Sequence, residues 1–141
     1  VLVDGKKYWV CDDAKERVFS GFDFKVIKKV KGSELVGLRY TGAFDHLPAV
    51  SKVSNEYPEK FHTVVATKDL IMPITTVDGT GLVHTAVSAG TEDFKLGREL
   101  GLPMIPVIND DASYIDGFNE LSGQNAKWHP IIILEKKKEK G

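Results

Sequence analysis

The sequence is made of short apolar runs separated by turn residues, and this spacing most limits the folds open to it. Asp4-Gly5 stands between two apolar segments and predicts a hairpin, because glycine tolerates the positive φ of a tight primed turn. Helices of crossover length do not separate the runs regularly, which argues against a doubly wound parallel sheet. The fold class predicted is mixed α/β, mainly β: a small closed or nearly closed mixed β-barrel with two or three flanking helices. Further strands or extended pieces are expected at residues 24–30, 35–40, 61–66, 70–74 and 104–108.

Three segments carry helix signals. The acidic pair Asp12-Asp13 can cap a short helix that ends near Phe19. Thr91 can cap a helix that runs through Leu100 and stops at the glycine that follows. A third helix is expected after Pro130, which suits a first helical turn. Residues 41–60 and 109–123 are rich in turn formers, so we interpret them as irregular and as mostly loop.

Length and composition limit the function. With 141 residues, the chain predicts a single domain spanning 1–141, and its non-methionine start suggests a piece of a longer protein. A net charge of −1 argues against a broad basic surface for duplex nucleic acid, but it leaves room for a site that binds a nucleic-acid end. Cys11 is the sole cysteine, so the chain has neither an internal disulfide nor a thiolate cluster for zinc, as is usual in a reducing compartment. No stretch approaches the roughly 20 apolar residues of a membrane span.

Several specific catalytic motifs are missing. No two of the four histidines stand four residues apart, as a helical zinc-protease motif requires. Gly79-Thr80-Gly81 begins like a dinucleotide fingerprint, but His84 occupies its third glycine position. The sequence also has no phosphate loop of the Walker type and no serine in a nucleophile elbow.

Residues 78–97 are the strongest functional candidate. A glycine-rich turn leads into an apolar strand that carries His84 and Thr85. The small-residue loop Ser88-Ala89-Gly90 follows, and small residues let a ligand approach the backbone. The next helix would then place unpaired N–H groups and Asp93 beside that loop. A carboxylate, an imidazole and hydroxyls around such a loop can hold a cationic amine and orient a water molecule.

Each of these residues also has a purely structural interpretation. An acidic residue in a first helical turn, such as Asp93, compensates the helix dipole. A histidine in an apolar strand is more often structural than functional, and Thr80 and Thr85 are ordinary turn and strand residues. Both interpretations stay open from the pattern alone. They predict different geometry: the functional one requires His84, Asp93 and the backbone of 87–90 to face one cleft.

The stretch resembles the editing domain of the class I aminoacyl-tRNA synthetases for isoleucine, valine and leucine, and the isoleucyl branch above all. The likeness rests on Gly79-Thr80-Gly81-x-Val83-His84-Thr85-Ala86 and then Gly90-x-x-Asp93-Phe94-x-x-Gly97. The His-Thr-Ala triplet favours the isoleucyl branch. Residues 31–40, the Leu-Gly-Leu-Pro at 100–103 and Asp116-Gly117 follow the family order.

The resemblance implies a fold, an activity and partners. The fold would be a small mixed barrel with flanking helices. The domain would hydrolyse valine wrongly attached to the isoleucine tRNA, receiving the 3′ end of that tRNA within a larger, cytoplasmic and monomeric synthetase. No cofactor or metal is expected in this domain, whereas the parent ligase would use ATP and Mg. Neither a membrane nor a nucleophilic serine or cysteine would be involved.

The resemblance also implies roles for individual residues. Asp93 would bind the α-ammonium of the misacylated amino acid, and His84 would contact the terminal adenosine or the substrate side chain without serving as a general base. Together these two are the catalytic candidates. Thr80 and Thr85 would line the pocket. The backbone of Val87, Ser88, Ala89 and Gly90 would approach the substrate.

The sequence departs from the family in two places. Val87 stands where a proline is usual, so we expect a different path for the loop 87–90. The threonine-rich segment that supplies the other pocket wall in the family has no counterpart here. Two alternatives therefore remain: an insertion that docks the tRNA 3′ end without hydrolysis, and the equivalent editing domain of a valyl- or leucyl-tRNA synthetase.

Overall fold

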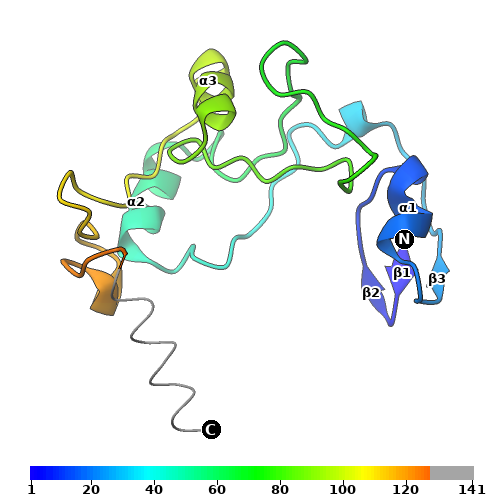
Figure 1. Ribbon diagram of the computed structural model, residues 1–141, viewed down its shortest axis with the longest axis horizontal. Coiled ribbons are helices and arrows are strands. Elements are labelled where there is room, and N and C mark those ends of the chain that lie inside the picture. Colours follow the sequence, from blue (N-terminus) through cyan, green and yellow to red (C-terminus); the bar gives the residue numbers. More distant parts are fainter. Residues whose placement is uncertain (128–141) are drawn as a thin grey trace, which may run out of the picture. The chain divides into compact units, whose positions relative to one another are not determined.

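The computed structural model describes residues 1–127, so the helix expected after Pro130 lies outside the described residues. The chain forms two compact units. The first comprises Val1–Arg39 and Thr63–Gly101. The second comprises Tyr40–His62 and the described residues from Leu102 onward. The residues singled out in the stretch 78–97 all belong to the first unit (Figure 1).

The first unit begins with a three-stranded antiparallel sheet. Strands β1 (Leu2–Val3), β2 (Lys6–Lys7) and β3 (Phe24–Lys25) pair in the order β2-β1-β3. The predicted hairpin is confirmed: Asp4 and Gly5 have φ values of 46° and 76°, as a primed two-residue turn requires. The strand expected at 24–30 is confined to its first two residues.

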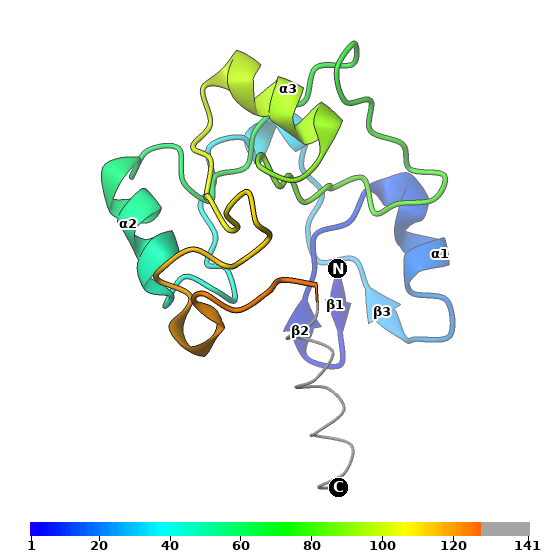
Figure 2. The same cartoon turned by 60° about the vertical axis from the view of Figure 1, so that its left-hand side comes forward.

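The mixed α/β class is confirmed, whereas the closed barrel is not, because the sheet is open in the part of the chain that the structure describes (Figure 2). Of the extended pieces expected at 35–40 and 61–66, only the isolated bridge Arg39↔Thr63 forms. The run at 104–108 contributes one more bridge, Ile108↔Tyr114. Residues 70–74 make no bridge at all. Apolar runs become strands only when neighbouring backbone completes a regular ladder. Here a few backbone hydrogen bonds, such as that from the Val64 N–H to the Leu38 carbonyl, flank each bridge without extending it into a strand.

A short 3-10 turn, η1 (Asp12–Ala14), leads into helix α1 (Lys15–Val18), which ends at Phe19 as predicted. The predicted cap is wrong: Cys11 occupies the cap position, and no side chain caps the turn. Asp12 instead binds Lys15 at 3.0 Å and Lys29 at 2.9 Å. The hydrogen bond from Lys29, followed by that from Lys15, lowers the pKa of Asp12.

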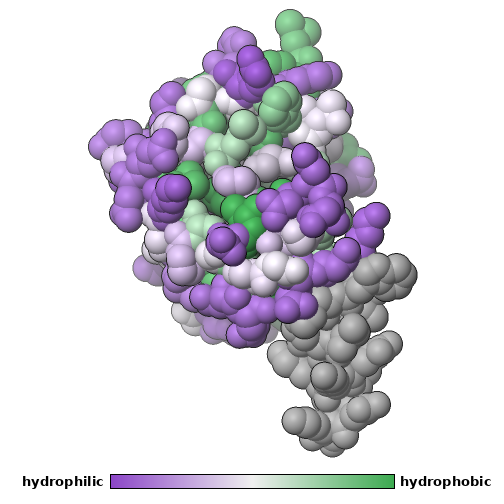
Figure 3. Space-filling view, turned by 90° about the vertical axis from the view of Figure 1, so that its left-hand side faces the viewer, coloured by the Kyte–Doolittle hydropathy of each residue, from purple (hydrophilic) through white to green (hydrophobic). Residues whose placement is uncertain are grey.

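Helix α2 (Pro48–Glu56) lies in a segment predicted to be irregular, so that prediction is wrong. Pro48 is at the start of the helix, where its missing N–H costs nothing. Val50 and Val53 are one turn apart and are buried against Phe61. These three side chains form the apolar core of the second unit. Seen from the side of α2 in Figure 1, apolar residues show between hydrophilic ones (Figure 3).

A histidine is clamped beside this core. The His62 ring stacks between the rings of Tyr40 and Phe61, with centroids 4.7 and 3.9 Å away. Its Nδ1 lies 3.1 Å from Oδ1 of Asp45, although neither atom has the geometry of a hydrogen bond. His62 has a φ of 46°, and a Cβ on Gly42 would lie 2.5 Å from the imidazole. Partial burial, followed by the charge of Asp45, raises the pKa of Tyr40.

Helix α3 (Thr91–Leu100) has the predicted bounds. It ends at Gly101, whose left-handed φ of 61° and ψ of 41° confirm the stop signal. Its cap residue is Gly90 and not Thr91. Two 3-10 turns, η2 (Gly32–Glu34) and η3 (Asn119–Leu121), complete the elements, and 109–123 is otherwise loop, as predicted.

Candidate functional site

The turn at the start of the motif is bonded to the end of the N-terminal hairpin. The Cys11 N–H donates to the Thr80 carbonyl at 2.8 Å, and a Cβ on Gly81 would lie 2.5 Å from the Cys11 Cβ. Gly81 also has a φ of 81°. The Thr80 hydroxyl donates to the Leu82 carbonyl at 3.0 Å and accepts from the Leu82 N–H at 3.3 Å. Thr80 therefore shapes the turn through local bonds.

Arg17 also holds this turn, which sequence reasoning missed. Its guanidinium donates to the backbone carbonyls of Thr76, Asp78 and Gly79. These partners lie 59 to 62 residues away along the chain, so no local spacing could have indicated the contact. An arginine offers five N–H donors in a fixed fork and can therefore bind several carbonyls at once. Arg17 in α1 thus fixes the backbone that precedes the motif.

The apolar strand expected after the turn does not form in the described residues, and the chain turns at residues 87–89 before helix α3. His84 is exposed, whereas Thr85 is half-buried. The Ala89 N–H donates to the Ala86 carbonyl at 2.8 Å, and the Gly90 N–H approaches the same oxygen at 3.4 Å. This single turn carries the loop residues predicted to approach a substrate.

Val87 attaches that loop to the helix. A Cβ on Gly97 would lie 2.3 Å from Val87 Cγ1 and 3.0 Å from Cγ2. Gly97 is buried in the middle of α3, and glycine there costs helix propensity of about 1 kcal/mol relative to alanine. Close packing of the loop on the helix explains why the position has no side chain.

Asp93 lies in the first turn of α3 and folds back onto its cap residue. A Cβ on Gly90 would be 2.0 Å from Asp93 Oδ2, so only glycine permits this side-chain position. Asp93 Oδ1 is buried and has no hydrogen-bond partner within residues 1–127. A buried, unpaired carboxylate oxygen is unfavourable and requires a donor or cation nearby. The helix N-terminus partly compensates the charge but leaves this oxygen without a bond.

The structure brings together some of the predicted site residues. Asp93 meets Gly90, and Val87 meets α3. In the part of the chain that the structure describes, no hydrogen bond or ion pair joins His84 to Asp93. A shared cleft for these two side chains stays a prediction, as do the roles of Thr80 and Thr85.

Comparison with known proteins then identifies the parent family. The chain is 37% identical to an isoleucine–tRNA ligase of Thermococcus kodakarensis over 98% of its own length, which is 13% of that relative. The isoleucine–tRNA ligase of Pyrococcus furiosus is 36% identical over 96% of the chain and 12% of the relative. That of Clostridium novyi is 33% identical over 98% of the chain and 12% of the relative. The chain belongs to the isoleucine–tRNA ligase family. It spans about an eighth of the length of these relatives, and no family model and no solved structure matches it.

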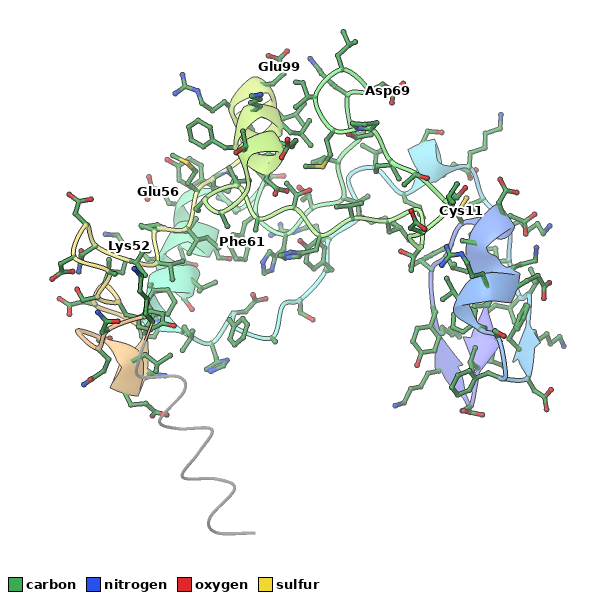
Figure 4. The ribbon with its side chains drawn as sticks, viewed as in Figure 1. Cys11, Lys52, Glu56, Phe61, Asp69 and Glu99 are labelled. Atoms are coloured by element: carbon green, nitrogen blue, oxygen red, sulfur yellow. The ribbon has the colours of Figure 1, made fainter. Side chains whose placement is uncertain are left out.

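The outer side of α3 in this isoleucine–tRNA ligase segment carries an open depression of about 500 Å³. None of the predicted site residues lines it; it is lined by Ile71, Phe94, Lys95, Arg98 and Glu99. The Lys68 ammonium binds Glu99 and lowers the pKa of that carboxyl. Figure 4 shows Glu99 and Asp69 in this part of the unit.

Metal ligation and membrane crossing find no support in the described residues. Among residues 1–127, no group of three His, Cys, Asp or Glu side chains is arranged to hold a metal ion. In the same part of the segment, no helix has the length and apolar character to cross a membrane.

Proposed function

We propose that this chain is the editing site of an isoleucyl-tRNA synthetase, hydrolysing the ester of valine wrongly attached to the isoleucine tRNA. Membership of the isoleucine–tRNA ligase family supports the parent enzyme. A pocket shaped for isoleucine can reject valine only by the binding of one methylene, roughly 1–3 kcal/mol, so a second, hydrolytic site is needed. The parent would use ATP and Mg for aminoacylation, and neither is part of the hydrolytic step proposed here.

The observation that carries the proposal is the unpaired Oδ1 of Asp93. The α-ammonium of an aminoacyl ester is a compact cation with N–H donors, and it would supply the bond that this oxygen lacks. Hydrogen bonds between ionised groups are roughly twice as strong as neutral ones. Gly90 has no side chain, and this leaves the space that the other carboxylate oxygen occupies.

The remaining parts of the site would position the ester and a water molecule. Gly90, the last residue of the loop 87–90, lies beside the carboxylate, and the small residues of this loop would allow a close approach. His84 would limit the space available to the amino-acid side chain, with Thr80 and Thr85 lining the pocket. An aminoacyl ester is already reactive, so oriented water can attack its carbonyl carbon while the ribose oxygen leaves.

The proposal includes the closed barrel that the resemblance implies. The outer edges of β2 and β3 carry no further strand in the described residues. Additional strands of the parent enzyme would have to complete the sheet. The partners of the segment would be the tRNA 3′ end and the rest of that enzyme.

The deciding test is deacylation of valyl-tRNA(Ile) by the complete parent enzyme, comparing Asp93→Ala with Glu92→Ala. Both acids stand in the first turn of α3, and Glu92 is exposed. Loss of a charge-assisted bond worth about 1.5–3 kcal/mol predicts a fall in kcat/KM of roughly 10- to 150-fold for Asp93→Ala. Glu92→Ala should stay close to native. Equal, small effects of the two substitutions would instead support dipole compensation and reject the proposal.

A docking insertion without hydrolysis is the second candidate, favoured by the missing contact between His84 and Asp93 in residues 1–127. It predicts that the native parent leaves valyl-tRNA(Ile) intact while still binding its 3′ end. A valyl- or leucyl-type site would instead hydrolyse the mischarged tRNAs of those enzymes, so the same assay with each substrate separates the three cases.

A further inference from the structure

One face of the N-terminal sheet carries a buried valine and a cluster of aromatic rings. Val3 is 6% exposed, and it pairs with Phe24 across the sheet. On the same side, Phe19 lies 5.8 Å from Phe24 and 5.6 Å from Tyr8, measured between ring centroids. These contacts define the packed face. The residues that alternate with them must point to the other side.

The opposite side, called here the lysine face, carries two cations around an apolar centre. Leu2 pairs with Lys7 on one neighbouring strand and with Lys25 on the other, and directly opposed residues share a face. Strands lie about 4.8 Å apart, so the two lysines stand roughly 10 Å apart across the sheet. Trp9 follows Lys7 by two residues and is 51% exposed. We define the lysine face as Leu2, Lys7 and Lys25 of the sheet together with Trp9, which follows β2 at the spacing that shares a face along an extended chain.

The N-terminal stretch that contains this face is basic. Residues 1–31 hold eight bases and five acids, a net charge of +3, although the whole chain carries −1. Residues 24–31 alone have four lysines and no acid. Asp12 is occupied by Lys15 and Lys29. Lys7 and Lys25 are both exposed and pair with no acid in residues 1–127.

The hairpin leads directly to the motif. Trp9 stands two residues before Cys11, whose N–H donates to the Thr80 carbonyl. Two extended residues span about 7 Å. Figure 4 shows Cys11 next to the loop that carries the motif turn. A polyanion bound on the lysine face would thus be anchored beside the loop that is proposed to receive an ester-linked 3′ end.

We propose that the lysine face binds the phosphate backbone of RNA, and that it grips the tRNA whose 3′ end reaches the motif. The identity of this RNA rests on the proposed function; the site itself rests on the sheet geometry. Spaced lysines neutralise phosphates, and an exposed tryptophan can stack on a base. Stacking favours RNA over an acidic protein segment, which would use the lysines alone.

The test measures binding of uncharged tRNA(Ile) to the full 141-residue chain between about 50 and about 200 mM salt. Lys7→Gln/Lys25→Gln is compared with Lys52→Gln/Lys127→Gln, which removes two exposed lysines of the second unit. Losing two phosphate contacts should lower the slope of log K against log salt by about 1.4–1.8 and weaken binding roughly tenfold or more at low salt. The control pair should leave both quantities unchanged.

Two further variants cover folding and base contact. Lys7→Arg/Lys25→Arg keeps the charge and should restore the salt slope even where the glutamine pair lowers stability. In a Trp128→Phe background, RNA should quench the fluorescence of Trp9, whereas poly-glutamate should not. Equal slopes for the two glutamine pairs, no binding of native protein, or equal binding of poly-glutamate would each overturn the proposal.

The two proposals fail separately. Asp93→Ala should lower the kcat/KM of deacylation by the parent enzyme roughly 10- to 150-fold without changing tRNA binding. The glutamine pair at Lys7 and Lys25 should weaken tRNA binding and raise the KM for deacylation. Loss of deacylation in Asp93→Ala with unchanged binding in the lysine variant would refute only the RNA surface. The reverse pattern would refute only the editing role.

Discussion

Gly97 offers the sharpest test of how the motif loop packs on α3. The effect of Gly97→Ala on the free energy of unfolding should depend on whether residue 87 is valine or alanine. Gly97→Ala gains about 1 kcal/mol of helix propensity in the middle of α3. The new Cβ would lie 2.3 Å from Val87 Cγ1, and overpacking of this kind costs about 1–3 kcal/mol. Valine has a stiff χ1, so it cannot swing aside freely. We expect Gly97→Ala to lower the free energy of unfolding by about 1 kcal/mol.

Val87→Ala removes both offending methyl groups. The Cβ that remains at residue 87 would lie 3.2 Å from a Cβ on Gly97, a contact that a shift of a few tenths of an ångström relieves. In this background Gly97→Ala should therefore be neutral or stabilising by up to about 1 kcal/mol. The coupling between the two sites is then about 1–2 kcal/mol, above the error of a double-mutant cycle.

Urea denaturation of the four proteins, followed by far-ultraviolet circular dichroism, measures this coupling. Gly32→Ala is a matched control, since a Cβ there meets no atom within 4 Å and its φ is not left-handed. A coupling below about 0.5 kcal/mol would show that Val87 does not pack on the helix and would refute the reasoning.

Three further predictions concern single side chains. Lys68→Met should raise the pKa of Glu99 toward its usual value, which carboxyl NMR titration measures. In the native protein this ion pair adds stability above the ordinary glutamate pKa, and that stability is lost as the pH falls through the lowered pKa. The variant should lack this pH-dependent contribution. Asp45→Asn should lower the pKa of Tyr40 only in part, because burial is the larger cause; ultraviolet titration of the phenol checks this, and a full return to the usual value would contradict it. Arg17→Met should speed amide exchange in the turn whose carbonyls it binds, and unchanged exchange would show that the guanidinium is dispensable.

What could be predicted from the sequence is local. The Asp4-Gly5 hairpin and the end of α3 at Gly101 depend on residues within a few positions, and both are confirmed. Helix α2 was missed because its proline, serines and asparagine are also turn formers. Val50 and Val53 are three residues apart, as on one face of a helix. This spacing indicates a buried helical face only once their contact with Phe61 is known.

What failed depends on distant partners. The runs at 61–66 and 104–108 have strand composition, yet a strand needs a neighbour to bond with, and sequence does not specify which segment supplies it. The contact between Arg17 and the motif turn is of the same kind. Within the site, the pattern placed Asp93 in the first helical turn correctly, but it could not show that one carboxylate oxygen is buried without a partner in residues 1–127.

Three of the four glycines of the motif are better explained by the protein's own packing than by ligand approach. A Cβ on Gly81 would collide with the sole cysteine, on Gly90 with Asp93, and on Gly97 with Val87. At each of these positions the space that a side chain would fill is already occupied by another part of the chain. The glycine spacing therefore encodes how the turn, the loop and α3 close on one another. What remains for a ligand is the product of that closure: the second oxygen of Asp93, buried and oriented but unbonded within the described residues. The motif therefore acts on the site through packing: it holds the turn, the loop 87–90 and α3 together. The Asp93 carboxylate can bind a cation in this position only while these three segments stay packed.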